Sequence, residues 1–165
     1  MSVEVGSLAP DFTLPSARPS QVSEQATGRV ESGSITLSAY RGKTNVLLAF
    51  YPGDFTPVCT SEMQCFADDW EQFRVLGCEI LGISSDPISK HEEFASQLKL
   101  PFPLLSDGDK TISKQYGVDS FLGTQRAYFI IDLQGILRYK HVEWLPVFKR
   151  NDEELLNVLR ELKAA

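Results

Sequence analysis

The sequence predicts an α/β protein in which a central mixed sheet is flanked by helices. First, continuous apolar segments of strand length alternate with amphipathic helical segments, which indicates parallel strands joined by helices. Second, two strand-like segments joined by a short turn lie near the C-terminus and precede a last helix. Third, the length of 165 residues is typical of one domain, so we expect a single domain over residues 1–165.

The first predicted element is a β-hairpin that extends the fold at its N-terminus. Asp11 to Leu14 and Ile35 to Ser38 each alternate apolar and polar side chains, which indicates two short strands. The segment between them, from Pro15 to Gly33, is rich in Ser, Pro and Gly and has no apolar period. It therefore predicts a long surface loop insertion at residues 15–33.

The middle of the chain predicts a strand–helix–strand–helix unit. The apolar runs from Asn45 to Tyr51 and from Glu79 to Ser85 indicate buried strands. Between them, Pro57 to Leu76 carries large apolar side chains at spacings of three and four, as an amphipathic helix does. Pro87 to Leu98 predicts a second helix, with Asp86 as its N-cap.

The last third predicts a short helix, a strand pair and a final helix. Asp109 to Tyr116 forms the short helix, and Ala127 to Asp132 and Ile136 to His141 form an antiparallel pair. Asp152 to Lys163 has its leucines on one face and predicts the final helix. A βαβ unit followed by a ββα unit is the thioredoxin architecture, so we expect a thioredoxin fold with the N-terminal hairpin added.

The composition excludes several classes of protein. Hydrophobic residues make up 42% and charged residues 23%, as in an ordinary globular chain, and the net charge of −6 argues against a nucleic-acid partner. No apolar run approaches the ~18 residues of a membrane span, and no secretory signal is visible. Three cysteines are an odd number, which favours reactive thiols in the cytoplasm over a disulfide framework. His91 and His141 lack metal-ligand spacing, so we expect solvated histidines and neither a metal nor a cofactor.

The segment from Tyr51 to Glu62 carries the chemistry. A buried strand ends at Tyr51, and a helix begins near Pro57, which places Cys59 in the first helical turn. Unpaired N–H groups and the helix dipole favour a thiolate there. Thr56 lies at or beside the N-cap, and Pro52 limits the access of water. On this reasoning alone, Cys59 is either a nucleophile or a small apolar residue of the core.

A resemblance extends over nearly the whole chain. The pattern Pro52-x-x-x-Thr56-x-x-Cys59 matches the active-site motif of the peroxiredoxins. The segments flanking it also resemble that family, except for the loop from Pro15 to Gly33: Val5 to Leu14, Leu37 to Lys43, Leu81 to Asp86 and Arg126 to Asp132. Within the family, the chain is most similar to the bacterioferritin-comigratory-protein type, also called peroxiredoxin Q, and to the one-Cys bacterial type.

The resemblance implies a role for each matching residue. Cys59 is the peroxidatic cysteine, whose thiolate attacks a hydroperoxide, expels water or an alcohol and becomes a sulfenic acid. Arg126 stabilises the thiolate and holds the peroxide oxygens, together with N–H groups of the first helical turn. Thr56 orients the peroxide, Pro52 shields the sulfur, and Glu62 orients Arg126.

The implied function is a thiol-dependent peroxidase that reduces hydrogen peroxide and organic hydroperoxides. Its partner is an external thiol reductant, which is a thioredoxin, a glutaredoxin or a low-molecular-weight thiol, and the protein is a monomer or homodimer. The alternative is a peroxide-sensing or holdase-like protein that uses the same cysteine. A thiol–disulfide oxidoreductase is disfavoured because Cys59 is not part of a Cys-x-x-Cys motif.

The number of cysteines in the mechanism depends on Cys65. Peroxiredoxins Q often carry a resolving cysteine five positions after the peroxidatic one, but here that position is Gln64. On a regular helix the Cα atoms of Cys59 and Cys65 lie roughly 10 Å apart, beyond the ~7 Å limit for a disulfide. The spacing therefore favours a one-Cys mechanism, with Cys65 a resolving residue only if the helix unwinds. Cys78 opens a buried strand and is expected to be a packing residue.

Overall fold

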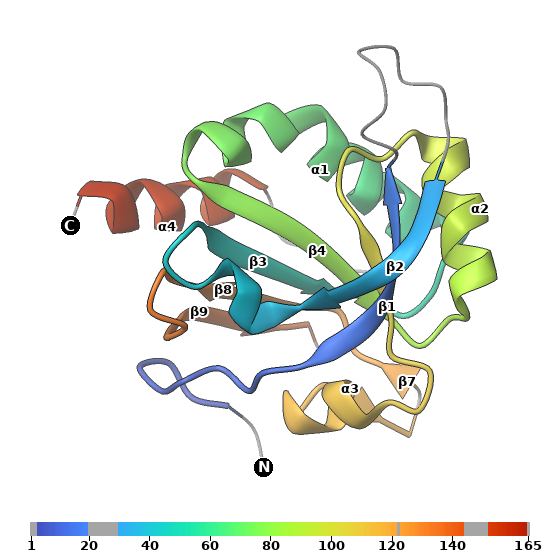
Figure 1. Ribbon diagram of the computed structural model, residues 1–165, viewed down its shortest axis with the longest axis horizontal. Helices are drawn as coiled ribbons and strands as arrows, with labels where there is room; N and C mark the ends of the chain where they lie inside the picture. The colour runs from blue at the N-terminus through green and yellow to red at the C-terminus, as the bar shows by residue number, and fades with distance from the viewer. Residues whose placement is uncertain (1–2, 20–29, 122, 144–151, 165) are drawn as a thin grey trace.

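The structure of this chain, a computed structural model, describes residues 3–19, 30–121, 123–143 and 152–164 (Figure 1). The strands are β1 (Thr13–Pro19), β2 (Val30–Thr36), β3 (Asn45–Phe50), β4 (Cys78–Ser84), β5 (Leu104–Ser106), β6 (Asp119–Ser120), β7 (Gly123–Thr124), β8 (Ala127–Ile131) and β9 (Leu137–Val142). The helices are α1 (Pro57–Val75), α2 (Ile88–Leu98), α3 (Thr111–Gln115) and α4 (Asp152–Ala164), with a 3-10 turn at Leu37–Tyr40.

Seven strands form one mixed sheet in the order β2-β1-β5-β4-β3-β8-β9, and β6 pairs separately with β7. Strand β3 lies inside the sheet, parallel to β4 and antiparallel to β8. Strand β5 continues the sheet parallel to β4, and β9 closes the other edge antiparallel to β8. The sequence of β3, α1 and β4, followed later by β8, β9 and α4, confirms the predicted thioredoxin architecture.

The sheet separates two hydrophobic cores, because side chains alternate along each buried strand. On β3, Leu47 and Ala49 belong to the core beneath α1, α2 and α4, which also contains Cys59. Val46 and Leu48 point to the opposite face, which is covered by α3 and the N-terminal segment. Figure 1 shows α1 and α4 on one side of the sheet and α3 on the other. The first of these two layers therefore holds the predicted nucleophile.

The N-terminal hairpin is longer than predicted. Strands β1 and β2 pair from Thr13↔Thr36 to Pro19↔Val30, so the predicted surface loop from Pro15 to Gly33 was wrong at both of its ends. Strand β1 also pairs with β5 on its other edge, and this pairing outweighs the two prolines that argued against a strand. Residues 20–29, the rest of the predicted loop, lie outside the described residues, as does the apolar run at residues 144–148.

Two further details differ from the prediction. Strand β5 was not predicted, because its three residues are too short to show a period. Helix α2 begins at Ile88 with Pro87 at the N-cap position, so Asp86 is not the cap. The Asp86 carboxylate instead accepts the backbone N–H of Asp54 at 2.6 Å, which ties the start of α2 to the turn before α1.

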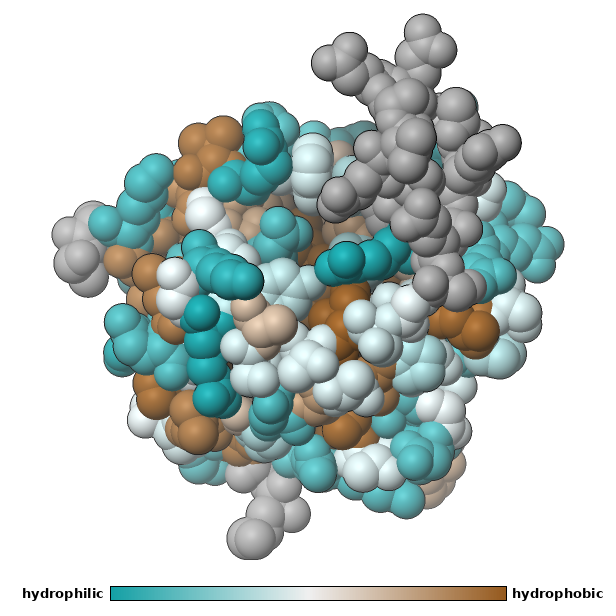
Figure 2. All heavy atoms as spheres, in the orientation of Figure 1, coloured by the Kyte–Doolittle hydropathy of each residue, from teal (hydrophilic) through white to brown (hydrophobic). Residues whose placement is uncertain are grey.

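None of the described helices is long and apolar enough to cross a membrane. On the face that Figure 2 shows, hydrophilic side chains are interspersed with small hydrophobic patches. The buried apolar surface lies instead in the two cores described above.

Candidate active site

The turn between β3 and α1 places Cys59 in the first turn of a long helix, as predicted. Thr56 is the N-cap of α1, and Pro57 follows at the first helical position. The Thr56 Oγ1 atom accepts the N–H of Cys59 at 3.4 Å, and its hydroxyl donates to the carbonyl of Gly53 at 3.3 Å. The turn also contains Phe55, whose φ of 66° lies in the left-handed region. Thr56 therefore closes the turn and directs the first N–H groups of α1.

The Cys59 sulfur is buried and contacts a guanidinium group. Arg126 Nη2 lies 2.9 Å from Cys59 Sγ, and neither side chain has more than about one per cent of its surface exposed. Arg126 directly precedes β8, and the pairing of Phe50 with Ala127 brings this end of β8 to the end of β3. A fixed positive charge at this distance favours the thiolate over the thiol.

Glu62 holds Arg126 in place. It lies one helical turn after Cys59, and its Oε2 atom accepts Arg126 Nη1 at 2.7 Å and the hydroxyl of Tyr128 at 2.5 Å. Burial alone would lower the pKa of Arg126, but Glu62 and Cys59 outweigh it and raise the pKa. The guanidinium therefore stays charged between a carboxylate and a sulfur.

The structure brings together four of the predicted site residues: Cys59, Thr56, Arg126 and Glu62. Pro52 lies half-buried in the same turn, at the end of β3. Sequence reasoning missed Tyr128, although its position two residues after Arg126, in the strand that Arg126 precedes, was a signal. Residues i and i+2 of a strand share a face, which is why both reach Glu62.

The other two cysteines lie apart from this contact. All three cysteines are described, and no disulfide joins them. Cys65 lies half-buried within the unbroken helix α1, six positions after Cys59. Cys78 is buried at the start of β4, where burial and, to a smaller extent, Glu79 raise the pKa of its thiol. Cys78 is thus an inert thiol in the resting fold, in agreement with the packing role predicted for it.

A second buried polar cluster lies beside the turn, and it includes His91. The sequence-based expectation of a solvated His91 was wrong: the side chain is fully buried, between the carboxylate of Asp54 and the carbonyl of Leu105. His91 shares the buried face of α2 with Phe94 and Ala95, a spacing that was a signal in the sequence. His141 is partly exposed and lies 3.1 Å from Glu143, close to the expectation for it.

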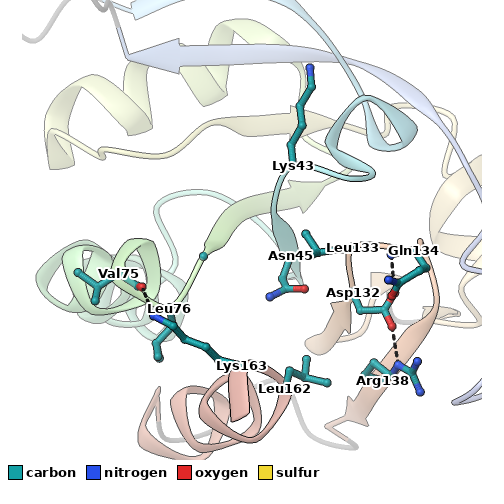
Figure 3. A pocket seen from close by; sticks show the side chains of 11 residues that line it. Lys43, Asn45, Val75, Leu76, Asp132, Leu133, Gln134, Arg138, Leu162 and Lys163 are labelled. Carbon is teal, nitrogen blue, oxygen red and sulfur yellow. Dashed lines mark hydrogen bonds and ion pairs between the residues drawn. The ribbon is translucent and has the colours of Figure 1, made fainter. Parts of the chain in front are cut away.

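A surface pocket of about 660 Å³ lies at the other end of the sheet, near the start of β3 and the end of α1 (Figure 3). Arg138 and Asp132 pair on one of its walls, and Lys163 Nζ donates to the carbonyl of Val75 on another. None of the residues around the Cys59 sulfur lines it. Among the described residues, no group of three or more His, Cys, Asp or Glu is arranged to hold a metal ion.

Comparison with known proteins gives a consistent result. The AhpC/TSA family matches residues 5–140. The chain is 37% identical to a peroxiredoxin of Thermoplasma volcanium, covering 99% of this chain and 76% of that protein. It is 39% identical to a putative peroxiredoxin bcp of Coxiella burnetii, covering 83% and 87% respectively. Among solved structures, the reduced 2-Cys peroxiredoxin of Plasmodium vivax superposes with a TM-score of 0.85 at 30% identity, covering 97% of this chain and 82% of that one.

Proposed function

Because this chain belongs to the AhpC/TSA family of peroxiredoxins, which are thiol peroxidases, we propose that Cys59 is the nucleophile of its peroxidase reaction. The observation that carries the proposal is the 2.9 Å contact between Arg126 Nη2 and Cys59 Sγ. The sulfur thus lies beside a buried cation, and it also lies in the first turn of α1. Both features favour a thiolate. Neither of the other cysteines lies at the start of a helix: Cys65 lies further along α1, and Cys78 opens β4.

In the proposed reaction, the Cys59 thiolate attacks one oxygen of a hydroperoxide and the O–O bond breaks. The sulfur becomes a sulfenic acid, and the departing oxygen takes a proton and leaves as water or an alcohol. Negative charge moves from sulfur to the departing oxygen, and Arg126 stabilises it along that path. Glu62, itself bonded to Tyr128, holds the guanidinium. Thr56 orients the peroxide, and Pro52 shields the sulfur from water. The substrates are hydrogen peroxide and organic hydroperoxides.

The proposed mechanism uses one cysteine of this chain. Cys59 and Cys65 lie on one continuous helix, where six residues separate their Cα atoms by roughly 10 Å, too far for a disulfide. The Cys59 sulfenic acid then reacts with an external thiol to give water and a mixed disulfide. A second thiol releases Cys59 and leaves as part of an external disulfide. A thioredoxin, a glutaredoxin or a low-molecular-weight thiol supplies these reducing equivalents.

Three further parts of the proposal concern the subgroup, the assembly and the location. We propose that the chain is of the peroxiredoxin Q or one-Cys bacterial type and acts as a single domain, as a monomer or homodimer. Two buried cysteines that remain thiols are typical of a reducing compartment, which supports a cytoplasmic location.

Consumption of hydrogen peroxide by the purified, reduced protein tests the proposal directly. We expect Cys59→Ser to abolish turnover and Cys78→Ser to keep most of it, because the Cys59 sulfur contacts Arg126 whereas Cys78 opens strand β4. Cys78→Ser is the matched control, since it makes the same change at the other buried thiol. A Cys59→Ser protein that consumed peroxide at nearly the parental rate would show that Cys59 is not the nucleophile.

A further inference from the structure

We propose that His91 is a positioning residue for the peroxidase site. Paired with Asp54 through one shared proton, it fixes the turn that leads into α1. The inference rests on the proposed role of Cys59 and adds a residue that does not itself touch the sulfur.

His91 and Asp54 form the centre of a closed hydrogen-bond network. His91 Nδ1 lies 2.6 Å from Asp54 Oδ2, and its Nε2 donates to the Leu105 carbonyl at 3.0 Å. The hydroxyl of Tyr51 donates to Asp54 Oδ1 at 2.6 Å. Neither the imidazole nor the carboxylate has any exposed surface. Every polar atom of the two side chains therefore has a partner, as buried polar groups require.

Helix α2 and its N-terminal flank hold two consecutive residues of the turn. The N–H of Asp54 donates to Asp86, which lies two residues before the start of α2. The ring of Phe55 packs edge-on against Phe94, three residues after His91, with 4.9 Å between ring centroids. Phe55 has a positive φ, a conformation that costs energy for a non-glycine residue and so needs surrounding contacts to persist.

The next residue along the chain is Thr56, which connects the turn to the site. Its Oγ1 atom accepts the N–H of Cys59, and its hydroxyl donates to the carbonyl of Gly53. Asp54 lies between these two ends of the turn. A rotation of the Asp54 backbone would therefore displace the N-cap of α1 and the N–H groups around the sulfur. His91 resists that rotation from outside the site.

The network requires one proton between His91 and Asp54. A carbonyl oxygen only accepts, so Nε2 of His91 carries a proton of its own. If no proton lay between Nδ1 and Oδ2, two lone pairs would face each other at 2.6 Å in a buried site. Burial and the Asp54 charge hold the pKa of Tyr51 well above its usual value, so its hydroxyl remains a donor. Removal of the shared proton would turn the attraction into repulsion.

Other titratable groups also surround the pair. Asp54 approaches from the turn, Tyr51 from the end of β3, and Asp86 with its partner Lys90 from the start of α2. Strand β5 contributes the Leu105 carbonyl, which does not titrate. Two of these groups reach His91 Nδ1: the carboxylate of Asp54 at 2.6 Å and, more weakly, the hydroxyl of Tyr51 at 3.4 Å. The shared proton therefore lies on the short contact with Asp54, and substituting Asp54 tests that contact.

Two substitutions test the His91–Asp54 hydrogen bond: one keeps the bond but replaces the shared proton with an amide proton, and the other removes the bond. In Asp54→Asn, the amide NH₂ donates to a neutral His91 and the amide oxygen still accepts from Tyr51, so the network persists without the shared proton. In His91→Leu, the buried Asp54 carboxylate loses His91 and keeps only Tyr51 of these two side-chain partners. The matched control is Glu93→Gln, the same carboxyl-to-amide change at an exposed position of α2.

The experiment measures the rate constant of Cys59 oxidation by hydrogen peroxide in stopped flow from pH 5 to 10. We expect His91→Leu to lower it about tenfold or more at pH 7, as a displaced site does. Glu93→Gln should match the parent at every pH. Asp54→Asn should retain the parental order of magnitude at pH 7, because its amide keeps the hydrogen bonds to both His91 and Tyr51.

Two results would overturn the proposal. One is a His91→Leu protein with the parental rate and pH profile. The other is a folded Asp54→Asn protein whose rate constant falls tenfold or more, and this result remains decisive if His91→Leu does not fold. A merely structural role would lower the free energy of unfolding of His91→Leu and leave the rate constant of its folded form unchanged. Because Cys59→Ser tests the nucleophile separately, an inactive Cys59→Ser protein beside a parental His91→Leu protein would refute this inference alone.

Discussion

Arg126 Nη2 lies 2.9 Å from Cys59 Sγ, although 67 positions separate the two residues in the chain. The contact depends on the antiparallel pairing of β3 with β8, which brings the residue before β8 to the helix that follows β3. Arg126 in turn is held by Glu62, so the positive charge is fixed before any substrate arrives. Such preorganisation is how protein charges stabilise a transition state without having to move.

Replacing Arg126 tests this charge. Arg126→Met keeps an apolar stem of similar length but removes the cation, so the thiolate fraction of Cys59 at pH 7 should fall. We expect the second-order rate constant with hydrogen peroxide to drop about tenfold or more, in line with the loss of a close opposite charge. Thiolate absorbance near 240 nm and stopped-flow oxidation measure the two effects. Arg138→Met, at a half-exposed arginine on β9, is the control, and an equal loss there would contradict a specific role for Arg126.

The two groups that hold Arg126 should differ in importance. Glu62→Gln removes the charge that balances the guanidinium, whereas Tyr128→Phe removes only one hydrogen bond to Glu62. We expect Tyr128→Phe to lose about 1 kcal/mol of unfolding free energy and little peroxidase rate. Glu62→Gln should lower kcat/KM more than Tyr128→Phe does. The reverse order in steady-state kinetics would show that Tyr128, not Glu62, positions the arginine.

The three cysteines should differ in their reactions. After one equivalent of hydrogen peroxide, we expect Cys59 to carry a sulfenic or sulfinic acid while Cys65 remains open to alkylation. Cys78 should resist alkylation in the folded protein, because burial raises the pKa of its thiol and excludes the reagent. Digestion without reductant, followed by mass spectrometry, identifies each product. A dominant Cys59–Cys65 disulfide peptide would refute the one-Cys mechanism.

A prediction about stability concerns Asp132, far from the site. Burial alone would raise its pKa, but the ion pair with Arg138 and the N–H groups of Ile136 and Gln134 lower it overall. A carboxyl group with a lowered folded pKa stabilises the fold above its unfolded pKa of about 4, and this contribution disappears as acid protonates the folded group.

We therefore expect Asp132→Asn to reduce the unfolding free energy by about 1 kcal/mol at pH 7 and by much less at pH 3. Urea denaturation at the two pH values measures the difference. Peroxidase activity at pH 7 is the control and should match the parent, because Asp132 lies at the opposite end of β8 from Arg126. A deficit of equal size at both pH values would mean that the Asp132 charge contributes nothing to stability.

The sequence predicted the central fold because its signals are local. The buried strands β3 and β4 and the helix α1 each show their own period, and helix start signals place Cys59 in the first turn. The ends of the segment from Pro15 to Gly33 escaped prediction, because their strand structure depends on the pairing of β1 with β2 and with β5 rather than on local preference.

Parts of the site were also beyond sequence reasoning. The spacing of His91 with Phe94 was a sign of its burial, but its hydrogen-bond partners lie 37 and 14 positions away in the chain and could not be predicted. Tyr128 lies in an apolar run, where an aromatic ring is expected for packing alone. In both cases, long-range hydrogen bonds determine the role of the residue, and these do not follow from local periodicity.

The complete burial of Cys59 means that the resting fold acts as a size filter. A molecule as small as hydrogen peroxide needs only a brief fluctuation of the surrounding side chains to reach the sulfur. A protein reductant or a bulky thiol reagent has to wait for a larger opening of the first turn of α1. Oxidation of Cys59 by peroxide therefore requires a smaller opening of α1 than reduction of its sulfenic acid by a thiol. A substitution that stiffens this turn can leave oxidation fast and slow reduction.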